Sequence, residues 1–202
     1  MHRSLCICAV MPRLQTRTRL ILLIHRIEAR KPTNTGQLAA LCLPNSDVVE
    51  RGHQGTITHD GELRWPADSQ PLMIFPHDDA VPIANFVGCD KPISLIVPDG
   101  TWRQAFKMKK RMPELAHVPC VSLPDGDETQ YRLRIERRPG GLATIEAIAR
   151  AFGILEGAEV ERELTRIFHI MVERSLWARG SIATEDVTGG IPDGAQRHQP
   201  LR

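Results

Sequence analysis

Short apolar runs that end at a turn and alternate with helical patterns constrain the fold of this chain most. Residues 20–24 read Leu-Ile-Leu-Leu-Ile, and a run that is apolar at every position indicates a strand buried on both faces. We predict further strands at 72–75, 94–97, 120–123 and 131–135, and a short strand and hairpin within 47–70.

Helical patterns lie between and after these runs. The helix expected over 101–112 begins with a capping box formed by Thr101 and Gln104, and we expect Trp102, Ala105 and Phe106 to form its buried side. Alternating strands and helices predict an α/β domain with a mainly parallel sheet and flanking helices. The other predicted helices span 37–43, 142–155 and 158–179.

The length of 202 residues is enough for one domain that folds without disulfides or metal. We assign residues 1–180 to this single domain, with 1–18 as its lead-in, and the polar, glycine-bearing stretch 181–202 to a mobile tail. The chain has five cysteines, an odd number, and they are widely spread, which is typical of reduced thiols. Because no run approaches the length of a membrane span and no signal peptide is evident, we expect a cytoplasmic protein.

The charges are distributed unevenly although the net charge is only +2. Residues 1–40 carry a net +6 and residues 41–90 a net −6, while 102–112 hold five basic groups and no acid. Two interpretations fit this pattern equally: an electropositive side that binds a polyanion, or a scattered solvated surface. Helical spacing places four of the basic residues on one face, namely Arg103, Lys107, Lys110 and Arg111.

The sharpest local feature is an acid and a glycine between a strand and a helix, at Asp99 and Gly100. Ligands of open α/β sheets bind outside the carboxyl ends of the strands, where a glycine allows close backbone approach. Asp99 is therefore a candidate active-site carboxylate. In the alternative interpretation, Asp99 only caps the helix and Trp102 only packs beneath it; spacing alone favours this alternative.

The segment Asp99-Gly100-Thr101-Trp102 resembles the D-x-T-W signature of the DTW-domain family, the tRNA-uridine aminocarboxypropyltransferases. A single tetrapeptide has little specificity, but further motifs recur in the family's order over about residues 6–178. These are Cys6-x-Cys8, Pro12-x-Leu14-x-Thr16-Arg17-Thr18, His25-x-x-Glu28, Thr33-Asn34-Thr35-Gly36, Phe75-Pro76, Tyr131-x-Leu133-Arg134 and Leu142-x-Thr144-x-Glu146-Ala147.

The resemblance implies a SPOUT-like domain with a C-terminal trefoil knot that binds S-adenosylmethionine at the strand ends. Its activity would be transfer of the 3-amino-3-carboxypropyl group to N3 of a tRNA uridine, with release of methylthioadenosine. Related sequences commonly carry a second cysteine pair before Cys6 and Cys8, which would complete a four-thiolate zinc site. Two thiolates cannot close such a site, so we expect no metal.

The resemblance also assigns candidate site residues, and we expect a monomer that binds tRNA and S-adenosylmethionine and no membrane. N3 of uridine is a poor nucleophile until its proton leaves, so a carboxylate within reach would act as the base. Alternative functions are a SPOUT-type RNA methyltransferase using the same cofactor, or an RNA-binding module without catalysis. The candidates are Asp99, Thr101 and Trp102 for catalysis; Phe75, Pro76, Pro98, Asp99, Gly100, Gly141, Leu142 and Thr144 for the cofactor; and Arg17, Asn34, Arg103, Lys107, Lys110, Arg111, Arg132 and Arg134 for RNA.

Overall fold

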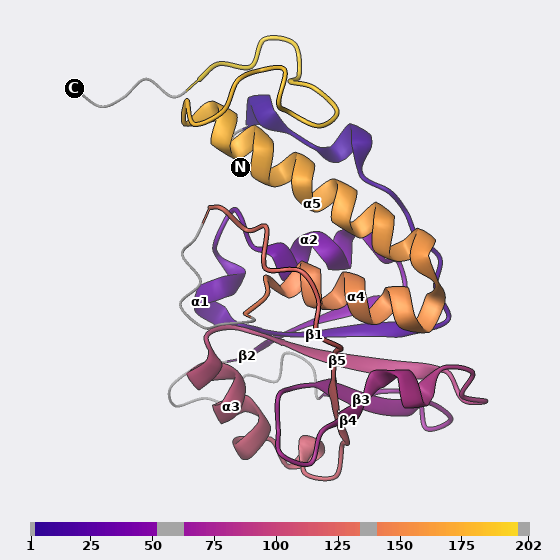
Figure 1. Ribbon diagram of the computed structural model, residues 1–202. Helices are drawn as coiled ribbons and strands as arrows, with labels where there is room; N and C mark the ends of the chain where they lie inside the picture. Colours follow the sequence, from indigo (N-terminus) through magenta and orange to yellow (C-terminus); the bar gives the residue numbers. More distant parts are fainter. Residues whose placement is uncertain (1–2, 52–62, 134–140, 198–202) are drawn as a thin grey trace.

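A six-stranded sheet, parallel at every strand pair of the described residues, forms the centre of the protein (Figure 1). The computed structural model describes residues 3–51, 63–133 and 141–197. The strand order is β2-β1-β5-β3-β6-β4, which confirms the mainly parallel sheet. The strands are β1 (Arg19–His25), β2 (Ser46–Arg51), β3 (Gln70–Ile74), β4 (Val81–Pro82), β5 (Ile93–Asp99) and β6 (Cys120–Ser122).

Strand β1 is buried on both faces, as its unbroken apolar run predicts. Successive side chains of a strand point to opposite faces, and here they enter two different cores. Leu20, Leu22 and Ile24 belong to the larger core, whereas Ile21 and Leu23 belong to the smaller one. The sheet therefore separates two hydrophobic layers, and each must be covered by helices.

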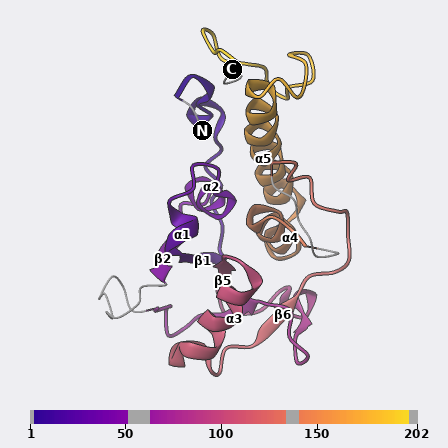
Figure 2. The ribbon, with the colours of Figure 1, turned by 90° about the vertical axis from the view of Figure 1, so that its left-hand side faces the viewer.

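Helices cover both faces of the sheet, most of them on one side (Figures 1 and 2). The larger core lies under α2 and α4, with α5 packed outside them. Among the α-helices of the described residues, α3 covers the opposite face, where Ala105 and Met108 enter the smaller core. The helices are α1 (Arg26–Ala29), α2 (Thr35–Cys42), α3 (Trp102–Arg111), α4 (Thr144–Glu156) and α5 (Ala158–Ala178), and the 3₁₀ turns are Arg3–Leu5, Cys8–Val10, Ile83–Phe86 and Pro113–Leu115.

The first and the last segments of the described residues lie at the far end of α5 (Figure 1). Leu5, Trp177 and Val187 form a small third core there. Arg174 of α5, 4% exposed, donates to the carbonyl of Cys6 at 2.7 Å and to that of Gly190 at 3.0 Å. The described part of the predicted tail, 181–197, is thus attached to α5 without regular helix or strand. None of the helices in the described ranges is long and apolar enough to cross a bilayer.

Two local predictions are wrong. Residues 131–133 are irregular, with a turn at 132–133, and do not form a strand, because the Tyr131 hydroxyl donates to the Thr33 carbonyl at 2.8 Å and holds this segment against the loop before α2. Trp102 and Phe106 are 41% and 54% exposed; the buried side of α3 is Ala105 with Met108 instead. Two parts of the predicted elements lie outside the described residues: 134–135 of the strand predicted at 131–135, and 52–62 of the region predicted to hold a hairpin.

The connections after the neighbouring strands β1 and β5 run over opposite faces of the sheet. The segment after β1 passes through α2 on one face, while the segment after β5 passes through α3 on the other (Figure 2). A crevice opens at the carboxyl edge where neighbouring strands lead to opposite faces, and ligands of α/β proteins bind in such a crevice. The topology therefore predicts a ligand site at the carboxyl edge of the sheet, which carries Asp99.

Candidate active site

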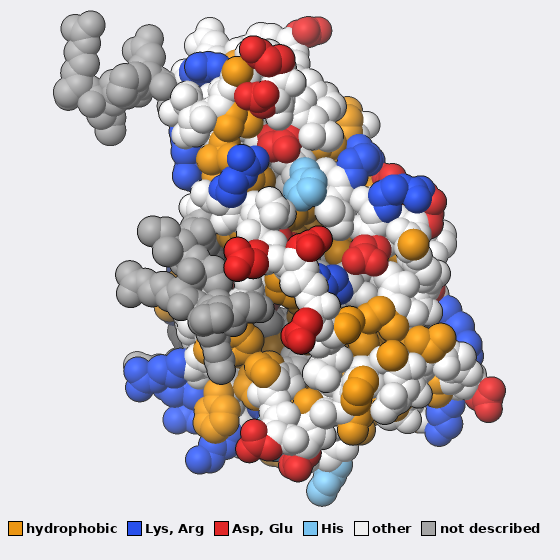
Figure 3. Space-filling view, in the orientation of Figure 1, with side chains coloured by type: hydrophobic (Ala, Val, Ile, Leu, Met, Phe, Trp, Pro, Cys, Tyr) orange, Lys and Arg blue, Asp and Glu red, His pale blue; other side chains and the backbone are white. Residues whose placement is uncertain are grey.

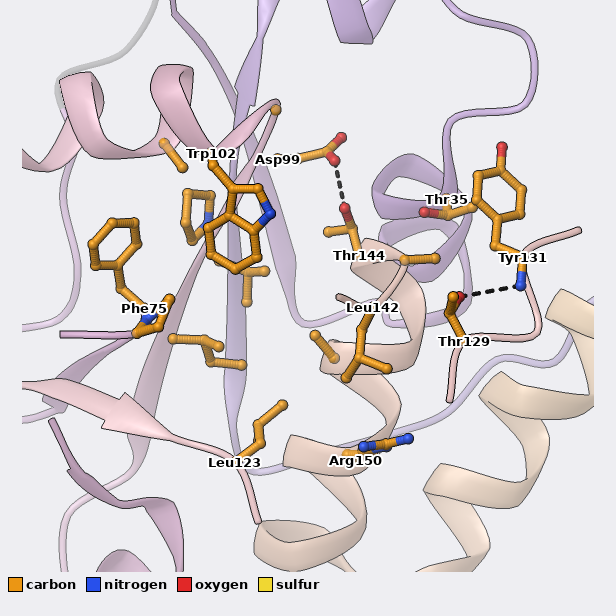
Figure 4. Close-up of a pocket in the computed structure, with 18 of the residues that line it drawn as sticks. Thr35, Phe75, Asp99, Trp102, Leu123, Thr129, Tyr131, Leu142, Thr144 and Arg150 are labelled. Carbon is orange, nitrogen blue, oxygen red and sulfur yellow. Dashed lines mark hydrogen bonds between the residues drawn. The ribbon is translucent and has the colours of Figure 1, made fainter. Parts of the chain in front are cut away.

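A cavity of about 660 Å³ lies at the carboxyl edge of the sheet. Its walls come from the ends of β3, β5 and β6 and from the segments that precede α2 and α4. In Figure 4, Phe75 and Trp102 lie on one side of the cavity, and Leu142, Thr144 and Tyr131 lie on the other. The cavity is within the size range of small-molecule and cofactor sites, and its position is the one that the strand-end argument predicts.

Asp99 lines this cavity although it is only 6% exposed. Its Oδ1 accepts a hydrogen bond from the Thr144 hydroxyl at 2.5 Å, and its Oδ2 accepts one from the Asn34 amide at 2.6 Å. The residue that caps α3 is Thr101, whose side chain accepts from the backbone N–H of Gln104. The interpretation of Asp99 as the cap of this helix is therefore wrong.

Side chains point alternately to the two faces of the sheet along β5, and this alternation explains why Asp99 faces α2 and α4. Leu95 and Val97 enter the core beneath these helices, and Asp99 continues the same face two residues later. Asp99 thus meets residues at the starts of both helices: Thr144 at the first position of α4 and Asn34 at the cap of α2. Helix N-termini favour negative charge, so this position suits an ionised carboxylate.

Gly36 is required for this close approach. A Cβ at residue 36 would lie 2.9 Å from Leu22 Cδ1 and 3.0 Å from Asp99 Oδ2, both shorter than van der Waals contact. Asn34 is held from the other side because its Oδ1 accepts from the Gln37 N–H at 2.7 Å. The Thr33–Gly36 loop therefore both caps α2 and positions Asp99.

A second carboxylate, Glu146, connects the cavity wall to α4. It accepts hydrogen bonds from the Ala143 N–H at 2.7 Å, the Thr129 hydroxyl at 2.6 Å and the Gln130 N–H at 2.7 Å. The next residue after Gln130 is Tyr131, which is 9% exposed and whose ring centre lies 5.8 Å from that of Phe168. These contacts attach the segment after β6 to the start of α4, so that both form one wall.

The charged lining of the cavity is mainly acidic. Lys31 and Arg150 are the two basic residues among its described walls, and Lys31 is paired with Glu28. Arg150 donates to the backbone carbonyl of Asp127. The acidic residues of the lining are Glu28, Asp99, Asp125, Asp127 and Glu128, and the apolar ones include Ile74, Phe75, Leu123 and Leu142. Such a cavity attracts a cationic ligand with apolar surface.

The structure brings the predicted catalytic and cofactor residues together, with one small exception. Gly141 is buried and does not line the cavity, although its neighbour Leu142 does. Thr101 is exposed at the rim and serves the capping box. The predicted residues that line the cavity are Phe75, Pro76, Pro98, Asp99, Gly100, Thr101, Trp102, Leu142 and Thr144.

The predicted RNA-binding residues are dispersed. Arg17 precedes β1, so it lies at the amino edge of the sheet, and its guanidinium donates to the carbonyls of Cys89 and Asp90. Seven residues of strand, roughly 23 Å, separate it from the edge that carries Asp99. Asn34 is engaged with Asp99, Arg132 is exposed outside the cavity lining, and Arg134 lies outside the described residues. The four predicted RNA-binding residues of α3, namely Arg103, Lys107, Lys110 and Arg111, are all exposed.

Several lining residues carried no recognisable signal from local spacing. Lys31, Thr129 and Arg150 reach the cavity only through long-range packing. Glu28, Glu146 and Tyr131 belong to motifs of the family resemblance, but those motifs did not indicate that these residues form or hold the cavity wall. The acidic stretch 125–128, directly after a strand, is the one signal that could have identified this wall in advance.

The cysteines lie away from this cavity. Cys6 and Cys8 are exposed in the first turns of the chain, and the Cys8 N–H donates to Cys6 Sγ at 3.4 Å. Hydrogen bonding with Cys8 lowers the pKa of the Cys6 thiol and raises that of Cys8. All five cysteines are free thiols, and the described residues contain no cluster of three or more His, Cys, Asp or Glu side chains suited to a metal.

Fold and site together define an α/β protein with a ligand cavity at the carboxyl edge of a parallel sheet, built around a buried, hydrogen-bonded aspartate. The family model of the DTW domain matches residues 1–176. The chain therefore belongs to the DTW-domain family, and the motif that begins at Asp99 lies at the centre of the cavity. No solved structure matches the chain.

Curated relatives carry names that describe a transferase. The chain is 30% identical over 161 residues to tRNA-uridine aminocarboxypropyltransferase 2 of Macaca fascicularis, covering 76% of this chain and 54% of that relative. It is 28% identical over 163 residues to the protein of the same name from Drosophila melanogaster, covering 79% and 65%. It is 29% identical over 201 residues to tRNA-uridine aminocarboxypropyltransferase A of Arabidopsis thaliana, covering 84% and 76%. The chain thus spans about half of the macaque relative's length and about two thirds of the fly relative's.

Proposed function

We propose that this protein transfers the 3-amino-3-carboxypropyl group of S-adenosylmethionine to N3 of a uridine in tRNA. The observation that carries the proposal is the position of Asp99: a buried carboxylate that lines the strand-end cavity within the motif of the family. The names of the relatives support tRNA uridine as the substrate.

The residues of the cavity fit S-adenosylmethionine in size and in charge. This ligand carries a sulfonium, an ammonium and one carboxylate, and the lining provides five acids and two bases. Phe75, Leu123 and Leu142 would contact its apolar surface. Arg150 is the basic side chain available for its carboxylate, since Lys31 is paired with Glu28. When bound, the ligand supplies an alkyl group on a sulfur that leaves readily, so the transfer itself needs no metal.

The chain's own contribution is to position the uridine and to accept its proton. As Asp99 takes the N3 proton, the nitrogen lone pair forms a bond to the γ-carbon, and the carbon–sulfur bond breaks with its electrons moving to sulfur. The Asp99 carboxylate lines the cavity, so it can accept that proton directly from a uridine bound there. The neutral thioether methylthioadenosine would be the second product.

The proposal includes the wider expectations of the family resemblance. These are a SPOUT-like arrangement with a C-terminal trefoil knot, and a monomeric protein that works in the cytoplasm on tRNA. The exposed basic residues of α3 would hold tRNA phosphates, which provide affinity and register rather than sequence selectivity.

Mass spectrometry of nucleosides tests the reaction directly. Purified tRNA would be incubated with the protein and S-adenosylmethionine, and both products would be measured. We expect a uridine heavier by one aminocarboxypropyl unit together with methylthioadenosine. Methylated uridine with S-adenosylhomocysteine would identify a methyltransferase instead, and tRNA binding without either product would identify an RNA-binding module.

A further inference from the structure

Helix α3 exposes two aromatic side chains one turn apart. The chain has nine aromatic residues of the Phe, Tyr and Trp types. Among the large hydrophobic side chains exposed in the described residues, only Trp102 and Phe106 are aromatic. Single exposed apolar residues are common on protein surfaces, but two aromatics at i and i+4 on the helix beside the active cavity form a continuous surface.

Each of these rings borders a different hollow. Trp102 lines the strand-end cavity. Phe106 lines a second, shallower hollow of about 370 Å³ at the far end of α3, which the catalytic proposal does not use. Its other lining residues are His77, Lys109, Lys110, Arg111, Met112, Pro113 and Ala116.

The lining of the second hollow is positively charged, and the nearby acid Asp79 lies beside its His77 at 3.5 Å. Three of its lining residues are basic and none is acidic. Arg103 and Lys107 add two further positive charges to the same helix, whose sequence contains no acid. In the space-filling view of Figure 3, Lys and Arg side chains gather at the lower left, over α3, around a hydrophobic side chain. An aromatic ring within such a cluster is the combination that binds single-stranded nucleic acid.

We propose that Phe106 and the second hollow bind one unpaired nucleotide of the RNA substrate, adjacent to the target uridine. The base of this nucleotide stacks on the Phe106 ring, and Lys110 and Arg111 contact the phosphate of the same nucleotide. Trp102 and Phe106 are four residues apart, so their backbone positions differ by roughly 6 Å along the helix axis. An extended single strand can therefore place the target uridine in the active cavity and its neighbour on Phe106. This inference rests on the proposed function for the identity of the RNA.

The arrangement explains why α3 leaves an aromatic ring in solvent. Met108 and Ala105 already fill the smaller core, so Phe106 adds nothing to that packing and remains 54% exposed. Basic side chains alone would bind any phosphate backbone. The ring adds an interaction that requires an unstacked base, and it therefore selects a loop or a bulge over a duplex.

Binding of a short, fluorescently labelled oligouridylate across a salt series tests the inference. Base–aromatic stacking is worth about 1–3 kcal/mol per base, so Phe106→Ala should weaken binding by about 5- to 150-fold. Phe106→Trp keeps a π-face and should bind at least as tightly as the wild type. Phe106→Leu keeps apolar bulk without that face and should resemble the alanine variant. Leu41→Ala, at another exposed apolar residue, is the control and should bind as the wild type does.

The salt dependence separates stacking from charge. The Phe106→Ala variant should retain the wild-type salt slope, because stacking releases no counterion. Lys110→Ala should reduce the slope by about 0.7, the value for one phosphate contact on a single strand. Wild-type affinity in Phe106→Ala, or equal affinity of the leucine and tryptophan variants, would overturn the inference.

The two proposals can fail separately. If the wild-type protein produces aminocarboxypropyl-uridine in tRNA while Phe106→Ala binds normally, the function stands and the nucleotide site is wrong. If Phe106→Ala loses binding as expected but the wild-type protein forms no such product, the nucleotide site stands and the proposed reaction is wrong.

Discussion

Asp99→Asn separates the chemical role of this carboxylate from its structural role. The variant keeps the shape of the side chain and replaces one oxygen by an amino group. Asn34 must keep donating to residue 99, because its own oxygen caps α2 through the Gln37 N–H. The new amino group therefore faces the Thr144 hydroxyl, which can rotate to accept a hydrogen bond.

The structure sets the expected loss of stability. Hydrogen bonds to a charged group contribute about 1.5–3 kcal/mol and neutral ones about 0.5–1.5, so converting two such bonds lowers the free energy of unfolding by about 2 kcal/mol. Removing a buried charge offsets part of this loss. Since domains are stable by about 5–15 kcal/mol, the variant should fold. Asp99→Ala leaves two donors without their carboxylate acceptor, at a cost of about 2–6 kcal/mol. A loss of activity in that variant could therefore result from unfolding as well as from the missing base.

The assay compares three measurements on the same preparations. Urea unfolding reports stability, calorimetry reports binding of S-adenosylmethionine, and single-turnover formation of methylthioadenosine on tRNA reports transfer. We expect Asp99→Asn to fold and to bind the cofactor, with the transfer rate lower by about 10²- to 10⁴-fold, the contribution of a general base. Thr144→Ser, which keeps the donor hydroxyl, should stay within a few-fold of wild type. A transfer rate in Asp99→Asn within threefold of wild type would show that Asp99 only anchors the helices.

Three further perturbations test the surroundings of the site. Gly36→Ala would raise stability in an open helix, where alanine is favoured by about 1 kcal/mol; here the added Cβ meets the site carboxylate at 3.0 Å, so thermal unfolding should show a loss of about 1–3 kcal/mol. Glu146→Ala removes the acceptor of three hydrogen bonds, and steady-state kinetics should show a higher KM for S-adenosylmethionine with a smaller change in kcat; an unchanged KM would contradict its role in holding the wall. Charge reversal of Lys107 with Lys110 should weaken tRNA binding and flatten its salt dependence, whereas Lys91→Glu, before the start of β5, should leave both unchanged.

The local elements of this fold were predictable because their signals lie within a few residues. The apolar run of β1, the capping box of α3 and the long helix α5 all appear at the expected places. The parallel sheet followed from their alternation. The site at the end of β5 also followed, since the carboxyl ends of parallel strands meet at one edge.

The incorrect expectations concern interactions between distant segments. Phe106 has the helical spacing of a core residue, yet the sheet face beneath α3 is filled by Ala105 and Met108. Tyr131 has the pattern of a strand, yet its hydroxyl binds Thr33, 98 residues away in sequence. Spacing cannot distinguish these outcomes, because it describes one element without its neighbours.

Sequence by itself therefore determined most of the helices and strands, the sheet class and the family, including the acid at the end of β5. Only the tertiary structure decided what surrounds that acid. The packing of α2 and α4 on one side of the sheet placed Asn34 and Thr144 against Asp99. The physical reason is that strand alternation and helix capping are local, whereas the partners of a buried charge come from segments that meet only after the chain has folded.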